Sequence, residues 1–282
     1  MNKQEIQAKL KEINDMVIFI DKPHSYKRVS DGKLLSGVTS IQGQIDKPFL
    51  IPWAAKEAVK CFGFYDTTKY LDGKNYPLPD DIIQQSKEKS IARYEELKNL
   101  NYDDFYTEVK NAKGAYRKTS SKALKIGDEM HEFLEIFVNA RIYGTNLPEI
   151  PKHLERPMFK FIRWEQESKI EWIASEAKVI SNEHLLAGTL DGLAYVDGKL
   201  TVIDFKTSKQ ISDEYFIQTA AYSLMLEEFG IVPEQRIIVK LPKTIDLEFE
   251  VKVVPTPLEF DKEVFLALTS LKKWIYYCKN NI

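Results

Sequence analysis

The chain has 282 residues, of which 44% are hydrophobic and 29% charged, and its formal net charge is −2. That length allows one large domain or two small ones with a sizeable core, and the composition is that of a soluble globular protein. No apolar run is long enough to span a membrane and the N-terminus has no signal-peptide pattern, so we expect a cytoplasmic protein without membrane association.

The N-terminal part is predicted to be mainly helical. An amphipathic helix is expected over residues 1–15, a strand over 16–20 and a hairpin around Asp31-Gly32. The segment 66–79 is rich in turn residues and is expected to be an irregular loop. Further helices are predicted over 52–62, 80–98, 102–112 and 119–140.

The C-terminal part is predicted to contain most of a sheet. Strands are expected over 170–180, 188–196, 199–206, 237–241 and 247–254. Helices are expected over 152–167, 215–229 and 259–279. Strands mixed with helices in this way indicate an α/β protein.

One predicted hairpin places two acids side by side. Asp197-Gly198 is a strong signal for a two-residue turn, and strand-forming residues flank it. If the turn closes the hairpin, Asp191 and Asp204 become cross-strand neighbours with Cβ atoms about 4.5–5.5 Å apart. Lys206 lies two residues after Asp204 and so points to the same face. Like charges repel at that distance, and a divalent cation with oxygen ligands would remove the conflict.

Several motifs stand around this pair, in a fixed order along the chain. They are Gly127-Asp-Glu-Met-His131-Glu-Phe-Leu-Glu135, Ala-Ser-Glu176-Ala-Lys, Gly188-Thr-Leu-Asp191, Val202-Ile-Asp204-Phe-Lys206-Thr-Ser-Lys209 and Gln218-Thr-Ala-Ala-Tyr222. Together they resemble the PD-(D/E)XK nuclease superfamily, and within it the RecB-type branch, which includes stand-alone phage exonucleases and a mitochondrial genome-maintenance exonuclease. The stretches Gly37–Ile41, Lys47-Pro48 and Trp53–Lys56 are similar to the N-terminal part of the phage enzymes.

The resemblance implies a fold and an activity. The expected fold is a central mixed β-sheet flanked by helices, in a single nuclease domain over 1–282. An N-terminal helical elaboration would cover about 1–125 and the catalytic core about 126–282. The expected activity is metal-dependent hydrolysis of phosphodiester bonds from DNA ends, in phage or bacterial recombination, repair or processing. The alternatives are an endonuclease of restriction type and a non-catalytic DNA-binding protein.

The resemblance also implies roles for individual residues. The expected catalytic residues are Asp191, Asp204, Lys206 and Glu176. The expected metal ligands are His131, Asp191, Asp204, the backbone carbonyl of Phe205 and, directly or through water, Glu176. Several of these residues also have a non-catalytic alternative. Asp204 and Lys206 could form a structural salt bridge, Glu176 could be solvated, and His131 could be structural. Glu135 is expected either to hold the His131 ring or to lie at the surface. Because acids surround Lys206, we expect electrostatic stabilisation from it rather than a lowered pKa and a role as base.

Contacts with DNA are expected from two groups of residues. They are Gln218, Tyr222, Thr207, Ser208 and Lys209 near the catalytic strand, and Lys113, Arg117, Lys118 and Lys122 in an acid-free basic run. The alternatives are packing for Tyr222, bracing of the active-site strand for Gln218, helix capping for Thr207 or Ser208, and a solvated helix face for the basic run.

The expected cofactor is Mg²⁺ or Mn²⁺, because carboxylates suit both ions and imidazole favours Mn²⁺. Cys61 and Cys278 cannot supply the four ligands of an iron–sulfur cluster, so none is expected. DNA, as single strands or duplex ends, is the expected partner. The sequence has no phosphate-binding Gly-x-x-x-x-Gly-Lys loop, so a helicase or recombination protein that works with it would be a separate chain.

Overall fold

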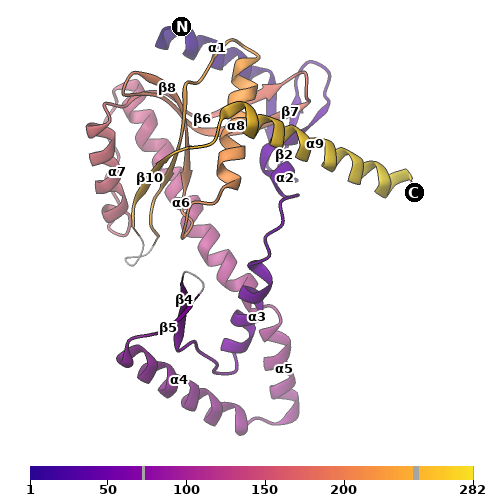
Figure 1. Cartoon of the computed structure of the whole chain (residues 1–282), viewed down its shortest axis with the longest axis vertical. Coiled ribbons are helices and arrows are strands. Elements are labelled where there is room, and N and C mark those ends of the chain that lie inside the picture. Colours follow the sequence, from indigo (N-terminus) through magenta and orange to yellow (C-terminus); the bar gives the residue numbers. More distant parts are fainter. Residues whose placement is uncertain (72–73, 244–247, 282) are drawn as a thin grey trace. The chain divides into compact units, whose positions relative to one another are not determined.

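The structure is a computed structural model that describes residues 1–71, 74–243 and 248–281. The chain divides into two compact units (Figure 1). One combines Met1–Ile45 with Ile126–Ile282, and the other is Asp46–Lys125. The first 45 residues were expected in the helical elaboration, but they belong to the unit with the large sheet, because their strands extend it.

The sheet-containing unit has an α/β architecture. Its strands are β1 (Val17–Ile20), β2 (Ser25–Arg28), β3 (Leu34–Gly37), β6 (Glu171–Ser181), β7 (Leu186–Val196), β8 (Lys199–Lys206), β9 (Gln235–Lys240) and β10 (Glu250–Val253). Its helices are α1 (Lys3–Asp15), α2 (Val38–Gln42), α7 (Glu155–Glu167), α8 (Glu214–Glu227) and α9 (Leu258–Asn281), and it shares α6 (Ala115–Tyr143) with the other unit. The strands and helices predicted here are present with ends that differ by a few residues; residue 247 of the last predicted strand lies outside the described residues.

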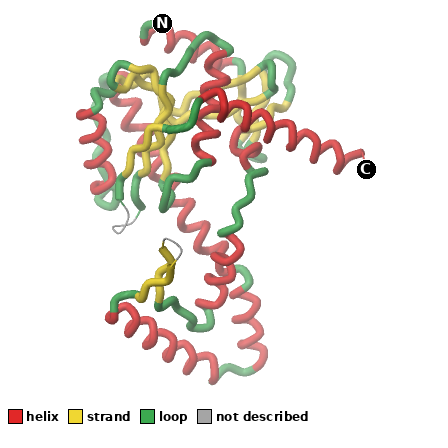
Figure 2. Tube along the Cα trace, in the orientation of Figure 1, coloured by secondary structure: helices red, strands yellow, loops and turns green. Residues whose placement is uncertain are grey.

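Figure 2 shows the strands in yellow with helices beside them. The sheet is mixed, and β7 lies in the middle of its strand order. One edge of β7 pairs with β6 in antiparallel fashion along almost its whole length. On the other edge, β7 pairs with β8 through Gly192–Val196 and, in parallel, with β3 through Leu186 and Ala187. Beyond β8 the sheet continues with the parallel strand β9 and the antiparallel strand β10. The expected central mixed sheet flanked by helices is therefore confirmed, and Asp191 lies where β7 passes from β3 to β8.

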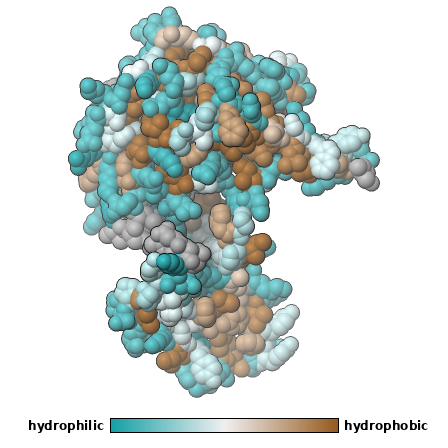
Figure 3. Space-filling view, in the orientation of Figure 1, coloured by the Kyte–Doolittle hydropathy of each residue, from teal (hydrophilic) through white to brown (hydrophobic). Residues whose placement is uncertain are grey.

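Two apolar clusters cover the two faces of the sheet. One joins the sheet to α1, α2, α8 and α9, with Ile6, Ile41, Met225 and Phe265 among its fully buried side chains. The other joins it to α6 and α7, with Phe137 and Phe161 at its centre. The displayed face of this unit is mainly hydrophilic, with scattered apolar patches (Figure 3). Both clusters hold the strands that carry the acids in fixed positions.

The β7–β8 hairpin has the predicted register. Its ladder runs from Val196 opposite Lys199 to Gly192 opposite Ile203. The turn residues Asp197 and Gly198 have φ values of 48° and 81°. Two positive φ values are what a type I′ hairpin turn requires, and Asp-Gly adopts them readily.

The second unit contains α3 (Leu50–Lys60), α4 (Asp80–Lys98), α5 (Tyr102–Ala112) and the first part of α6. It also contains an antiparallel hairpin of β4 (Thr68–Leu71) and β5 (Lys74–Pro77). The prediction of an irregular loop over 66–79 was therefore wrong. The strand-forming residues Thr68, Tyr70 and Tyr76 around an Asp-Gly dipeptide were the signal for a hairpin. No helix in the described part of the chain is long and apolar enough to cross a membrane.

Candidate active site

Three neighbouring strands each contribute one carboxylate to the same row across the sheet. Glu176 of β6 lies opposite Asp191 of β7, because the residues on either side of them pair with each other. Asp191 and Asp204 are the next residues beyond the last pair of the β7–β8 ladder. The flanking pairs are Ser175↔Gly192 and Ala177↔Leu190 for the first contact, and Gly192↔Ile203 for the second. The structure thus brings together the two aspartates that the hairpin register predicts and adds Glu176.

Asp191 links the two strands of the hairpin through its side chain. Its Oδ2 accepts a hydrogen bond from the Phe205 backbone N–H at 2.7 Å. Burial raises the pKa of Asp191, while the charge of Lys206 and the Phe205 N–H act to lower it. The predicted role of the Phe205 carbonyl as a metal ligand stays a prediction.

Lys206 and Asp204 form a close ion pair. Lys206 Nζ lies 2.8 Å from Asp204 Oδ1 and 2.6 Å from Oδ2, and the carboxylate is fully buried. The contact at Oδ2 is an ion pair without hydrogen-bond geometry, so this buried oxygen has no hydrogen-bond partner among the described residues. Burial raises the pKa of Asp204 to about 7, against the opposing effect of Lys206. A buried carboxylate oxygen without a hydrogen bond is costly, and a cation would satisfy it.

The pKa of Lys206 itself is raised. Burial acts to lower it, but the charges of Asp204 and Asp191 outweigh burial. The ammonium also lies 4.9 Å from the centre of the Tyr215 ring, close enough for a cation–π contact. Lys206 is therefore a fixed positive charge, as expected from the acids around it.

Glu176 occupies a strained position. Its φ of 48° is left-handed, a conformation that typically costs about 1–3 kcal/mol for a residue other than glycine. Burial, followed by the charge of Asp191, raises the pKa of Glu176 to about 8. Glu135, one helical turn after His131, contributes to the same shift and therefore lies near the acid row. Strain and a raised carboxyl pKa at one residue are typical of functional sites.

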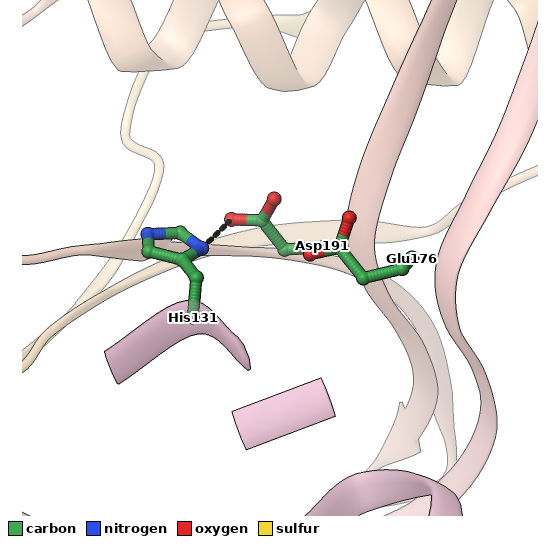
Figure 4. Close-up of side chains that lie close together, drawn as sticks. All are labelled: His131, Glu176 and Asp191. Atoms are coloured by element: carbon green, nitrogen blue, oxygen red, sulfur yellow. Dashed lines mark ion pairs between the residues drawn. The ribbon is translucent and has the colours of Figure 1, made fainter. Parts of the chain in front are cut away.

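His131 reaches the acid row from α6 (Figure 4). Its Nδ1 lies 3.8 Å from Asp191 Oδ2, and 31% of its side chain is exposed. Burial and the charge of Lys206 lower the pKa of His131, which favours the neutral ring that binds metals. His131, Glu176 and Asp191 each offer one ligand atom, and these atoms lie within 4.8 Å of one another. Two carboxylates and an imidazole at this spacing, beside the unsatisfied Asp204 oxygen, fit a divalent cation such as Mg²⁺ or Mn²⁺.

Gln218 and Tyr222 lie buried on α8 beneath the row. Gln218 Nε2 donates a hydrogen bond to Tyr222 Oη at 2.9 Å. Burial and then the charges of Asp191 and Asp204 raise the pKa of Tyr222, which places its ring close to the acids. A Cβ atom built on Gly188 of β7 would lie 2.8 Å from the Tyr222 ring, so Tyr222 packs against this strand. The bracing expected of Gln218 and the DNA contacts expected of both residues stay predictions.

The residues after β8 do not cap a helix. Helix α8 begins at Glu214 with Asp213 as its N-cap, so the capping alternative for Thr207 and Ser208 was wrong. The hydroxyl of Ser208 instead donates a hydrogen bond to the Gln210 carbonyl at 2.7 Å, and Lys209 is exposed. This segment stays available for the predicted phosphate contacts.

The basic run lies in the second unit. Its members Lys113, Arg117, Lys118 and Lys122 are all exposed. The Arg117 guanidinium lies 5.6 Å from the centre of the Tyr116 ring. These side chains are free to meet solvent anions, and a role in DNA binding stays a prediction.

Sequence reasoning missed Lys243, which follows β9. It belongs to no motif, but Lys206 pairs with Lys240 in the parallel β8–β9 ladder. Residues just beyond the C-terminal ends of parallel neighbours lie at the same sheet edge, where ligands of α/β proteins commonly bind. That topology was the available signal for Lys243.

A mixed sheet with a row of three acids, a paired lysine and a helix histidine defines a class of protein: an α/β protein with the acid–lysine site of phosphodiester-cleaving enzymes. The chain belongs to the PD-(D/E)XK nuclease superfamily, whose family model matches residues 103–273. No curated protein matches the chain.

Solved structures give partial matches. A protein named SSO0001 is 16% identical with a TM-score of 0.30, and the match covers 44% of this chain and 58% of that one, less than two thirds of its length. A candidate exonuclease from Eubacterium rectale is 16% identical with a TM-score of 0.38, over 56% of this chain and 67% of that one. An alkaline exonuclease from Laribacter hongkongensis is 15% identical with a TM-score of 0.28, over 53% of this chain and 82% of that one. The family assignment depends on the family model alone.

Proposed function

We propose that the protein is a divalent-metal-dependent exonuclease that hydrolyses phosphodiester bonds from the ends of DNA. The observation that carries this proposal is the row of Glu176, Asp191 and Asp204 with Lys206 and His131 beside it. Membership of the nuclease superfamily supports hydrolysis of a phosphodiester bond. The Gly-x-x-x-His helix and the Gln-x-x-x-Tyr motif, which resemble the RecB-type branch, favour action at DNA ends.

His131, Asp191 and Asp204 would hold the cation, with Glu176 as a further ligand. A divalent cation at this position supplies Lewis-acid stabilisation of the phosphate charge and lowers the pKa of the attacking water. Its binding requires the acids to lose their protons, which links affinity to pH.

Lys206 acts as a fixed charge in this proposal. Its raised pKa keeps it protonated, so it donates hydrogen bonds and does not accept a proton. It orients the attacking water and stabilises the negative charge that develops on the phosphate. Tyr222 packs against the strand that presents Asp191, and Gln218 donates a hydrogen bond to Tyr222.

The substrate side of the proposal involves polar residues that are at least partly exposed. Thr207, Ser208 and Lys209 follow the catalytic strand, and the basic run of the second unit offers further phosphate contacts. We place the activity in phage or bacterial DNA recombination, repair or processing, with unwinding supplied by a separate helicase or recombination protein.

One set of assays tests the proposal. Purified protein is incubated with Mg²⁺, Mn²⁺ or EDTA and with three substrates: oligonucleotides labelled at either end, linear duplex and covalently closed plasmid. We expect mononucleotides or short products from the linear substrates, no product in EDTA, and an untouched closed circle. Lys199→Ala, an exposed change at the far end of the hairpin, is the matched control and should keep full activity. Cleavage of the closed circle would make the protein an endonuclease, and no cleavage with either metal would refute the proposal.

A further inference from the structure

The side chain of Lys243 lies against helix α6 at Gly127, which is one helical turn before His131. A Cβ atom built on Gly127 would lie 3.2 Å from Lys243 Nζ and 3.0 Å from Thr207 Oγ1. Both polar atoms therefore converge on the same point of the helix surface. Glycine leaves room there for both side chains, which a larger residue would displace.

Lys243 belongs to the surroundings of the acid row. Its positive charge contributes to the lowered pKa of His131, after burial and Lys206. Burial lowers the pKa of Lys243 itself, against the opposing charge of Asp128. The ammonium is thus partly buried within electrostatic reach of a proposed metal ligand.

The net charge of the acid row explains why a second lysine near it would favour DNA binding. Three carboxylates line the row, and the one lysine among them is held by Asp204 at 2.6 and 2.8 Å. Without the divalent cation, a DNA phosphate that enters this region meets a surplus of negative charge, which repels it. A second ammonium at the edge of the row offsets that repulsion.

We propose that Lys243 and Thr207 form a phosphate-binding subsite at Gly127, which holds a backbone phosphate of the DNA strand next to the bond that is cleaved. Both groups donate hydrogen bonds, and an ammonium with a hydroxyl is a common donor set for phosphate oxygens. The proposal rests on the proposed function, because it assigns this subsite to the same DNA substrate.

Binding measured without cleavage tests the subsite. The full-length protein is titrated with a fluorescent single-stranded oligonucleotide in EDTA at several salt concentrations, and cleavage is measured separately in Mn²⁺. Lys243→Ala should weaken binding about tenfold at low salt, as expected for loss of a charged hydrogen bond. It should also reduce the slope of log affinity against log salt by about 0.7, the value for one lost phosphate contact on a single strand. Lys199→Ala removes the same charge from an exposed position and should change neither quantity.

Gly127→Ala is the second variant, and it changes no charge. The added methyl group would press on Thr207 and on the flexible end of Lys243, so it should displace both and weaken oligonucleotide binding several-fold. Alanine favours a helix over glycine by about 1 kcal/mol, so a misfolded helix would not explain the loss. Lys243→Arg should recover part of the binding because it restores the charge.

The outcomes separate the two proposals. Weaker binding and a smaller salt slope in Lys243→Ala, with the control unchanged, support the subsite. Wild-type cleavage with an unchanged slope and affinity in both Lys243→Ala and Gly127→Ala would overturn the subsite and leave the proposed function standing. A wild-type protein that neither binds nor cleaves DNA would overturn both.

Discussion

The strongest test of the acid row is the pH dependence of stability without metal. Burial and the charge of Asp191 raise the pKa of Glu176 from its usual value of 4.5 to about 8. Between these two values the folded protein holds a proton that the unfolded chain has released. The free energy of unfolding therefore falls as pH rises through this window, by about 1.4 kcal/mol per pH unit for one group. The stability that this group contributes is present below pH 4.5 and lost above about pH 8.

The perturbation is Glu176→Gln, which keeps the shape of a protonated glutamate and removes its titration. From pH 5 to pH 9 the shift of this one group corresponds to at most about 4 kcal/mol of lost stability in the wild type. Because the charges of Asp191 and Asp204 contribute to this shift, and Glu176 is only half-buried, we expect roughly 2–4 kcal/mol. Between pH 5 and pH 9 the free energy of unfolding should therefore fall by roughly 2–4 kcal/mol less in Glu176→Gln than in the wild type. The variant should be the more stable protein at pH 9.

The assay is urea unfolding of both proteins in EDTA at pH 5, 7 and 9, followed by circular dichroism. Glu171→Gln is the matched control: it lies on the same strand with 58% of its side chain exposed, and its ion pair with Lys3, at 3.5 Å, is a surface pair of the kind that contributes little to stability. It should follow the wild type at every pH. Parallel pH profiles for wild type and Glu176→Gln would refute the argument, because they would show that the Glu176 carboxylate is not confined among like charges.

The remaining predictions concern catalysis and register. Asp204→Ala should abolish metal-dependent cleavage in a protein that stays folded by circular dichroism; substantial residual turnover would remove Asp204 from the proposed ligand set. Lys206→Ala should lower kcat by about 10²–10³-fold, the usual effect of losing one donor to developing charge, with a much smaller change in the metal titration; a shift in metal requirement alone would contradict its role. One residue inserted between Asp197 and Gly198 should reduce cleavage more than two inserted residues at equal folded yield, because a one-residue slip of register moves Asp204 to the other face of the sheet; the opposite ranking would show that the turn does not set the geometry of the acids.

The centre of the site was predictable because its determinants are local. A two-residue Asp-Gly turn fixes the register of β7 and β8, and the alternation of side chains then decides which residues share a face. Asp191, Asp204 and Lys206 follow from those two rules. The family resemblance supplied His131 and Glu176, which local rules alone leave ambiguous.

The rest depends on contacts between distant parts of the chain. The parallel pairing of β3 with β7 joins residues about 150 positions apart, and no local signal announces it. For that reason the first 45 residues were expected in the elaboration and not in the sheet. The alignment of Glu176 with Asp191 likewise passes through a register shift between Trp172 and Ala174 and a left-handed residue, which alternation does not predict.

Three features of the acid row each cost folding stability, and they fall on neighbouring residues. Glu176 has a strained backbone, Asp204 has a buried oxygen with no hydrogen bond from the described part of the chain, and three carboxylates surround Lys206. Neutral side chains at these positions would remove the last two costs, so packing of the sheet does not explain the arrangement. A divalent cation would offset two of them at once, because it supplies further positive charge and a ligand bond to the Asp204 oxygen that lacks a hydrogen bond among the described residues. The strain at Glu176 then has a reason as well, since the left-handed turn of the backbone sets how its carboxylate meets the same centre. A site that is unfavourable without a ligand and consistent with one is best understood as a binding site for that ligand.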